Sequence, residues 1–454
     1  MADTVTAEVT ARRDGNFRNR PLSSMDNNNI PIQSRPIGES QKISRRDFVK
    51  QTSVAGLLCG LAGIVGPAAP LLRQFSPQNP VAAAPPTWEQ QLLGTAPRAR
   101  YWIATTTPGV TCQQCHPSGE APSPTDYHQS KPLIQCQLCA RNCTIGPGER
   151  GNCNARMNIA GELRSLVYGR PVSMHVDPIE KKPFYHFLPG SQAFSLATTG
   201  CPLHCQFCQN WELSQAKPED YRTEFIPPEM IVQATVQRQA GVIAFTYNEP
   251  TVFTEYLTDI ARVAADQRLR CVMISCGFMN EAPLNELCSV LDAIKIDLKG
   301  FSNDFYQRVC SAELPPVLRS IKQIARSGIH LEIVNLVVPT LNDSRPMLTD
   351  LVEWLAGEIG PDVPVLFTRF HPDYKMLNLP PTPIATLEMA YDIARERGLH
   401  YPYVGNVPGH PGNNTFCPAC GKAVIERTGF FVIENHLTDG HCQFCREPIA
   451  GVWN

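Results

Sequence analysis

Residues 193–208 read Ala-Phe-Ser-Leu-Ala-Thr-Thr-Gly-Cys-Pro-Leu-His-Cys-Gln-Phe-Cys. The apolar start of this segment favours a buried β-strand, and the glycine and cysteines after it place a cysteine-rich loop at the end of that strand. Five further strand-like runs begin near Val242, Cys271, Ala293, Leu331 and Val365. Between these runs, apolar residues recur at three- and four-residue steps, which predicts helices at 251–267, 317–327, 347–359 and 384–397. This alternation predicts an α/β fold, an open or partial (β/α)6 TIM-like barrel with its chemistry at the carboxyl ends of parallel strands.

The cysteine loop favours an iron–sulfur cluster. Cys201, Cys205 and Cys208 can bind three corners of a [4Fe–4S] cube and leave the fourth iron without a protein ligand. An open iron binds and polarises a substrate, whereas a cluster with four cysteine ligands mainly transfers electrons. A structural zinc loop is the alternative. We therefore predict that these three residues are the cluster ligands and the catalytic centre.

The spacing C-x3-C-x-aromatic-C resembles the signature of the radical S-adenosylmethionine (SAM) superfamily, and the Cys-Gln-Asn-Trp-Glu that follows is similar to the glycyl-radical-enzyme activases, such as pyruvate formate-lyase activating enzyme. More closely, residues 136–427 resemble the radical enzyme of the AmmeMemoRadiSam system. That likeness rests on Asp-Pro-Ile-Glu-Lys-Lys-Pro at 177–183, Tyr-His-Phe-Leu-Pro-Gly at 185–190 and Arg-Phe-His-Pro-Asp-Tyr at 369–374.

The resemblance implies reductive cleavage of SAM to methionine and a 5′-deoxyadenosyl radical, which takes a hydrogen atom from a protein or peptide substrate. It also implies an electron donor such as ferredoxin or flavodoxin, and the other AmmeMemoRadiSam proteins as partners.

The resemblance also implies roles for residues at the strand ends. Phe207 would pack beside the adenine, and Glu249 would bind the amino group of SAM. Relatives carry Gly-Gly before that glutamate, whereas this chain has Tyr247 and Asn248. Contacts with the ribose and carboxylate of SAM are implied for Ser275, Asp297, Lys299 and His371. The alternatives are a buried ion pair for Asp297 and Lys299, and a core histidine for His371.

Cysteine pairs at the C-terminus predict a four-thiolate metal site. Its expected ligands are Cys417, Cys420, Cys442 and Cys445, the spacing of a zinc ribbon, with a rubredoxin-like iron as the alternative. His-Cys-Gln-Phe-Cys occurs at both 204–208 and 441–445, but the second copy has Thr438 where the first has Cys201. The C-terminal copy therefore does not repeat the open-iron motif.

Two more cysteine groups precede the barrel. One group, similar to the N-terminal cysteine box of the same family, could hold a second iron–sulfur cluster or zinc: Cys136, Cys139, Cys143 and Cys153. The string Cys112-Gln113-Gln114-Cys115-His116 fits either a c-type haem attachment site or half of a zinc ribbon. The single cysteines Cys271, Cys276, Cys288 and Cys310 are expected to be packing residues.

The net charge and the N-terminal sequence indicate what the protein binds and where in the cell it is found. The net charge of −2 gives no reason to expect nucleic acid as a partner. Arg45 and Arg46 precede an apolar run at 54–72, which indicates a twin-arginine export signal or a membrane anchor; otherwise the protein is expected in the cytoplasm. The competing hypothesis for function is an exported electron-transfer protein with several iron–sulfur or c-type haem centres.

The expected domain organisation has five parts. They are a disordered N-terminus with the signal (1–84), a linker (85–110), a cysteine-rich region (111–192), the partial barrel (193–411) and a zinc-ribbon-like module (412–454).

Overall fold

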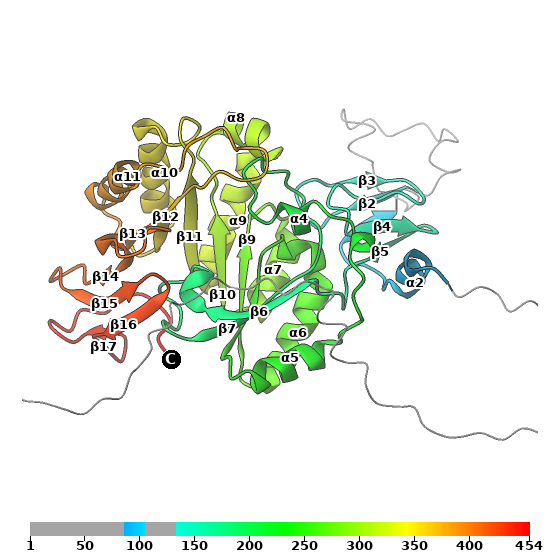
Figure 1. The fold of residues 1–454 in the computed structure, drawn as a ribbon, viewed down its shortest axis with the longest axis horizontal. Coiled ribbons are helices and arrows are strands. Elements are labelled where there is room, and N and C mark those ends of the chain that lie inside the picture. The colour runs from blue at the N-terminus through cyan, green and yellow to red at the C-terminus, as the bar shows by residue number, and fades with distance from the viewer. Residues whose placement is uncertain (1–85, 105–132) are drawn as a thin grey trace, which may run out of the picture. The chain divides into compact units, whose positions relative to one another are not determined.

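A sheet of eight strands forms the centre of the protein (Figure 1). Its structure is a computed structural model that describes residues 86–104 and 133–454. The strands are β6 (Ser173–Pro178), β7 (Gln192–Ala197), β8 (Val242–Phe245), β9 (Arg270–Ser275), β10 (Ala293–Asp297), β11 (His330–Val337), β12 (Val365–Arg369) and β13 (Pro402–Gly405). They lie side by side in chain order, all parallel except the antiparallel pair β6 and β7.

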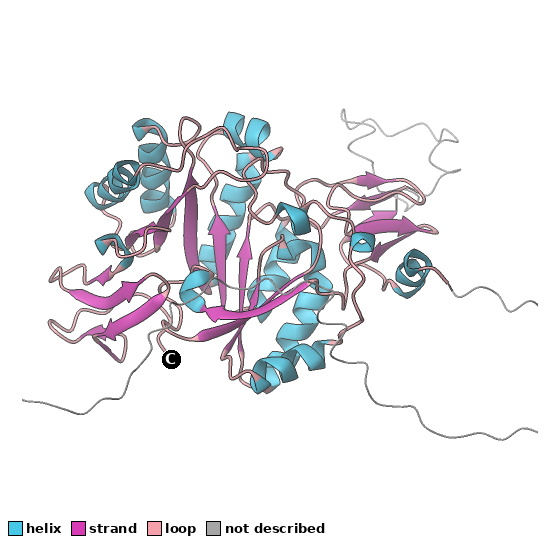
Figure 2. Cartoon of the chain, viewed as in Figure 1, coloured by secondary structure: helices cyan, strands magenta, loops and turns pink. Residues whose placement is uncertain are grey.

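Helices follow most of the parallel strands, as the chain alternation predicted (Figure 2). The longer ones are α5 (Pro228–Gln237), α6 (Thr254–Asp266), α7 (Glu281–Val290), α9 (Leu314–Ser327), α10 (Arg345–Glu358) and α11 (Ile384–Glu396). Short helical turns complete the loops: η1 (Ile179–Lys181), α4 (Trp211–Ser214), η2 (Pro218–Asp220), η3 (Pro250–Phe253), α8 (Asn303–Phe305), η4 (Tyr306–Cys310) and η5 (Pro411–Asn413).

Alternate residues of each strand pack on opposite sides of the sheet, because successive side chains of a strand point to opposite faces. Phe194 and Leu196 of β7 join the core made with the helices. Ala193, the residue before Phe194 in β7, packs on the opposite side of the sheet with Phe184 and Phe187. The segment that carries these two phenylalanines therefore fills part of the inner face of the sheet and leaves the carboxyl ends of the strands for a cavity.

All six strands expected from the sequence are present, and two more join them. β6 lies within the segment 111–192 that was expected to be a separate cysteine-rich region, yet it pairs with β7 along its whole length. Its sequence, Ser-Met-His-Val-Asp-Pro, has no apolar run, and β13 is only four residues long and begins with a proline. For these reasons the hydrophobic pattern of the sequence did not predict either strand.

Two small modules flank the central sheet. The N-terminal module consists of α2 (Trp88–Thr95), β1 (Trp102–Ala104), β2 (Ile134–Cys136), β3 (Thr144–Ile145), β4 (Arg156–Ile159) and β5 (Glu162–Ser165). The C-terminal module consists of β14 (Thr415–Phe416), β15 (Ala423–Thr428), β16 (Phe431–Asn435), β17 (Leu437–Thr438) and β18 (His441–Cys442). Cys417 and Cys442 of this second module are buried against Tyr403 and Leu366 of the barrel strands.

A buried ionic network joins the sheet to the segment 177–190. Glu332 of β11 is fully buried and accepts hydrogen bonds from the backbone N–H groups of Tyr185 and His186. Lys295 of β10 lies 3.1 Å from the same carboxylate. The strings used for the family resemblance at 177–183 and 185–190 therefore have a structural part in fixing this segment to the strands.

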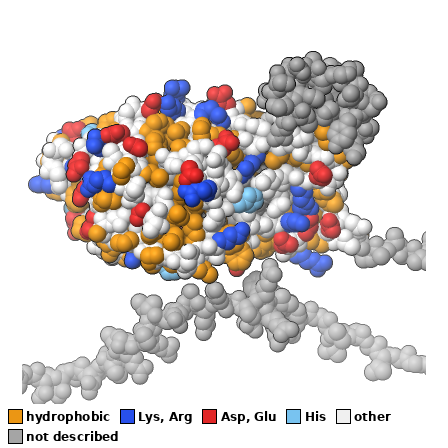
Figure 3. Space-filling model, turned by 90° about the horizontal axis from the view of Figure 1, so that it is seen from above, with side chains coloured by type: hydrophobic (Ala, Val, Ile, Leu, Met, Phe, Trp, Pro, Cys, Tyr) orange, Lys and Arg blue, Asp and Glu red, His pale blue; other side chains and the backbone are white. Residues whose placement is uncertain are grey.

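The surface mixes charged groups with apolar ones, as the face in Figure 3 shows. Within the described residues, no helix has the length and apolarity needed to cross a bilayer. The apolar run at 54–72 and the twin arginines lie outside the described residues, as does the string 112–116.

Candidate functional site

A cavity of about 310 Å³ lies at the carboxyl ends of the parallel strands. Its walls come from the loop after β7, from the ends of β8, β9 and β10, and from β11, β12 and the residue after β13. Most of the predicted site residues line it: Cys201, Cys205, Phe207, Cys208, Glu249, Ser275, Asp297 and Lys299. Parallel strands end at one edge of a sheet, so residues far apart in the sequence meet here.

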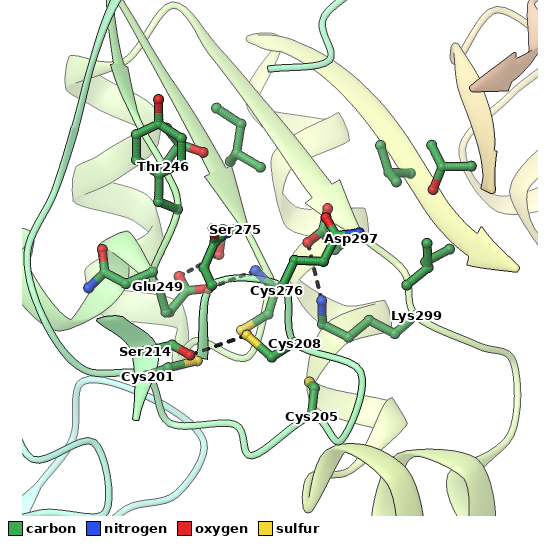
Figure 4. A pocket seen from close by; sticks show the side chains of 18 of the residues that line it. Cys201, Cys205, Cys208, Ser214, Thr246, Glu249, Ser275, Cys276, Asp297 and Lys299 are labelled. Atoms are coloured by element: carbon green, nitrogen blue, oxygen red, sulfur yellow. Dashed lines mark hydrogen bonds and ion pairs between the residues drawn. The ribbon is translucent and has the colours of Figure 1, made fainter. Parts of the chain in front are cut away.

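The three cysteines occupy one side of the cavity, with Glu249 and Ser275 facing them from the strand ends (Figure 4). The backbone N–H of Leu203 lies 3.4 Å from Cys201 Sγ, and Ser214 Oγ lies 3.2 Å from Cys208 Sγ. Among the described cysteines of this loop, the three Sγ atoms do not converge to within 4.8 Å of one another. Such spacing suits a cluster, in which each thiolate binds a different iron, rather than a single ion.

Glu249 is a buried carboxylate held by neutral donors. It is 3% exposed, and its Oε1 accepts hydrogen bonds from Thr251 N–H and from Ser275 Oγ at 2.7 Å. Its Oε2 accepts a hydrogen bond of 2.7 Å from Cys276 N–H. In the described part of the chain, no lysine, arginine or histidine forms an ion pair with it. The site therefore presents a buried carboxyl group with which a cationic ligand can pair.

Asn248 joins the strand end to the cysteine loop. Its Nδ2 donates to the carbonyl oxygen of Gly200 at 3.0 Å and to Thr198 Oγ1 at 3.2 Å. Its buried Oδ1 has no hydrogen-bond partner within the described residues, and the residue lines the cavity. Asn248 thus offers a free acceptor to a ligand in addition to its structural contact.

Tyr247 occupies a position where the family resemblance led us to expect glycine. Its φ of 71° lies in the left-handed region, which glycine adopts without strain. Its hydroxyl donates to Asp177 at 3.0 Å, and Lys182 lies over its ring at 5.0 Å. The contacts with the 177–183 segment hold the tyrosine in this conformation.

Asp297 and Lys299 form an ion pair of 3.2 Å on the cavity wall. Burial disfavours the ammonium of Lys299, but the Asp297 carboxylate and the Cys205 sulfur outweigh it and hold the Lys299 pKa well above its usual value. The Lys299 ammonium also lies over the ring of Phe207 at 5.8 Å. The pair expected as a structural alternative is thus present, and it faces the cavity.

One predicted residue, His371, lies apart from this group, and residues that were not predicted, Cys276 and Phe430 among them, join it. His371 is exposed, its Nδ1 lies 3.0 Å from the carbonyl of Pro372, and it is not part of the cavity wall. Cys276, expected to be a packing residue, is buried but also lines the cavity. Its position directly after β9 was the available signal. Phe430 reaches the cavity from the turn between β15 and β16, and no sequence pattern indicated this.

The C-terminal cysteines converge as the sequence predicted. The Sγ atoms of Cys417, Cys420, Cys442 and Cys445 all lie within 4.8 Å of one another. Cys417 Sγ is 3.5 Å from Cys445 Sγ, and Cys420 Sγ is 3.8 Å from Cys442 Sγ. A tetrahedral ion with metal–sulfur bonds of about 2.3 Å separates its sulfurs by roughly 3.8 Å.

Comparisons with known proteins agree with this site. Residues 195–352 match the Radical SAM superfamily. An uncharacterised protein of Methanocaldococcus jannaschii is 44% identical over 318 residues, which cover 70% of this chain and 95% of that protein. The pyruvate formate-lyase-activating enzyme of Clostridium pasteurianum is 23% identical over 155 residues, or 34% of this chain and 64% of that enzyme.

Among solved structures, a domain of a pyruvate-formate lyase-activating enzyme from Bacteroides vulgatus is similar at 17% identity. The match covers 37% of this chain and all of that domain, with a TM-score of 0.33.

Proposed function

Because this chain belongs to the radical SAM superfamily, we propose that it reductively cleaves SAM in the cavity at the strand ends. The hydrogen atom that the reaction removes comes from a protein or peptide substrate. One observation supports the proposal most strongly. Three cysteines of a single loop line the same cavity as Glu249, a buried carboxylate with no cationic partner in the described chain.

The residues present fit both cofactors of such an enzyme. Cys201, Cys205 and Cys208 would hold a [4Fe–4S] cluster with one open iron. Glu249 would accept hydrogen bonds from the ammonium group of SAM, and the unpartnered Oδ1 of Asn248 would accept another. When bound, the two cofactors supply an electron transfer that yields methionine and a 5′-deoxyadenosyl radical.

The protein contributes position and charge. Ser275 and Cys276 N–H fix the Glu249 carboxylate, so little reorganisation is needed when a cation binds. Lys299, held charged by Asp297, would face the carboxylate of SAM. Phe207 would pack on the adenine, with the Lys299 ammonium beyond its ring.

A protein substrate is supported by the mouth of the cavity. Phe430 lines the cavity and is 37% exposed, and the adjacent Phe431 is 64% exposed. An apolar segment of a partner chain would cover these rings. Ferredoxin or flavodoxin is the proposed electron donor, and the other AmmeMemoRadiSam proteins are proposed as partners on the sequence resemblance alone.

The competing hypothesis of a multi-centre electron-transfer protein gains no support. Its haem string, at 112–116, lies outside the described residues, and the matched family is one of enzymes. A ligand cavity with a free carboxylate has no part in simple electron transfer.

For the C-terminal module we propose a structural zinc. The two sulfur–sulfur distances of 3.5 and 3.8 Å support a tetrahedral ion, and two of the four cysteines are buried against the barrel. Iron fits the same geometry, so metal analysis of the protein must distinguish them.

Electron paramagnetic resonance of the reduced, reconstituted protein tests the function. We expect a [4Fe–4S] signal that shifts when SAM is added, because SAM binds the open iron. Cys205→Ala should remove the shifting signal, while Cys288→Ala, a half-buried cysteine outside the cavity, should retain it. A full signal that SAM leaves unchanged would refute the proposal.

A further inference from the structure

The cysteines of the N-terminal module form a site that the radical chemistry does not use. Cys136 ends β2, Cys139 and Cys143 follow in the turn to β3, and Cys153 precedes β4. Three of the four are buried and Cys143 is half-buried, and none forms a disulfide. Gly151 lies between two of them, since a Cβ there would be 3.8 Å from Cys143 Sγ and 3.9 Å from Cys153 Sγ.

The spacing of these sulfurs differs from that of the C-terminal site. No three of the Sγ atoms of Cys136, Cys139, Cys143 and Cys153, all described, lie within 4.8 Å of one another, whereas the four C-terminal sulfurs all do. A single tetrahedral ion needs its sulfurs roughly 3.8 Å apart, but a cubane cluster spreads them because each binds a separate iron. The C-terminal site thus has the size of a single ion, whereas the N-terminal sulfurs are too far apart for one tetrahedral ion as they stand.

A buried arginine, Arg156, lies in the wall of the N-terminal site, close to its cysteines. Arg156 is 1% exposed, and its positive charge acts on Cys136 and Cys153. Glu255 of α6 holds the guanidinium in place at 2.6 Å. A cluster with four thiolate ligands has net negative charge in either of its common redox states, and the guanidinium, although it is ion-paired with Glu255, offsets part of that charge.

The N-terminal site is in direct contact with the loop of the radical cluster. Gly200, which precedes Cys201, has a φ of 97°, and a Cβ there would lie 2.3 Å from the carbonyl oxygen of Cys153. Arg141 Nε donates to the carbonyl of Pro202 at 2.9 Å, and Asn152 lies 2.8 Å from His204. The two cysteine loops therefore pack on each other without intervening chain.

We propose that Cys136, Cys139, Cys143 and Cys153 bind a second [4Fe–4S] cluster, which passes electrons to the cluster at Cys201, Cys205 and Cys208. The relay rests on the proposed function, whereas the binding of the second cluster does not. A low-potential one-electron donor of the ferredoxin or flavodoxin class reduces the N-terminal cluster by one electron. That electron then moves to the radical cluster, and no bond or proton changes place.

Iron and acid-labile sulfide counts of the full chain, reconstituted without oxygen, test the site. We expect about eight irons and eight sulfides per chain in the unaltered protein, since each cluster holds four of each. The triple variant Cys201→Ala/Cys205→Ala/Cys208→Ala should keep about four of each. Adding Cys136→Ala and Cys139→Ala to that variant should remove them, and Cys288→Ala is the matched control.

Sulfide distinguishes a cluster from a single iron bound at the C-terminal site, because a single iron ion has none. If the triple variant has no sulfide but gains a zinc ion at the N-terminal site, the inference is overturned. Absence of a SAM-dependent signal in a protein with eight irons would refute the proposed function and leave the second cluster in place.

The relay is tested by freeze-quench spectroscopy of Cys136→Ala/Cys139→Ala with reduced flavodoxin. We expect the SAM-responsive cluster to become reduced at least about tenfold more slowly than in the Cys288→Ala control. An equal rate would overturn the relay. Retention of the SAM-dependent shift in this variant shows that the neighbouring loop is still folded.

Discussion

The proposed binding of SAM depends most on the Glu249 carboxylate. Changing Glu249 to Gln preserves the shape of the side chain and removes the charge that would pair with an ammonium group. A hydrogen bond between charged groups is worth about 1.5–3 kcal/mol, so SAM affinity should fall roughly 10- to 100-fold. Equilibrium binding measures this, with iron content unchanged. Glu281→Gln, at the exposed start of α7, is the control. Equal affinity in both variants would show that Glu249 is only structural.

His186 makes the stability of the folded protein depend on pH. It is fully buried, with Nδ1 2.5 Å from the carbonyl of Ala450 and Nε2 beside the Tyr403 hydroxyl. Burial lowers the pKa of His186 from 6.5 to about 3. The unfolded chain therefore binds a proton below pH 6.5 that the folded protein refuses until about pH 3. Its contribution to stability is complete above 6.5 and is lost as the pH falls.

Chemical unfolding between pH 6.5 and 5 measures this effect. The free energy of unfolding should decrease by up to about 1.4 kcal/mol per pH unit from this group alone. In His186→Asn that part of the slope should vanish, although the variant is less stable overall. The same slope in both proteins would mean that His186 is protonated in the folded state.

At the scale of elements, the C-terminal module depends on its metal. Cys442→Ala should release one zinc ion per chain and leave the iron content unchanged, because the radical loop lies elsewhere. Since Cys417 and Cys442 pack against Tyr403 of the barrel, Tm should fall by roughly 5 °C or more. Metal analysis and thermal unfolding check both effects. A zinc content equal to that of Cys288→Ala would contradict the assignment.

Much of the central sheet could be predicted because parallel strands are buried on both faces and read as apolar runs. β8, with all four residues buried, is the clearest case. β6 alternates polar residues at the edge of the sheet, and α7 contains Pro283, so periodicity missed both. Strand-end residues such as Ser275 and Asp297 met as expected. Phe430 could not be predicted, because only tertiary packing brings its hairpin to the cavity.

For the whole molecule, the location remains a proposal from sequence. Arg45 and Arg46 precede the apolar run at 54–72, and we propose export by the twin-arginine route, which carries folded proteins with their cofactors. Fractionation of cells that express the full chain should find it outside the cytoplasm, and Arg45→Lys/Arg46→Lys should retain it inside. Cytoplasmic protein in both strains would contradict export and leave the chemistry unaffected.

The products formed from SAM show whether the protein cleaves it reductively. The reduced, reconstituted full chain should convert SAM to methionine and 5′-deoxyadenosine in equal amounts, because one electron breaks one carbon–sulfur bond. Cys201→Ala should form neither product, and Cys288→Ala should form both. Quantification by liquid chromatography and mass spectrometry makes the comparison. If the protein, with its cluster intact and SAM bound, yields no 5′-deoxyadenosine, or yields S-adenosylhomocysteine in its place, the proposed reaction is wrong.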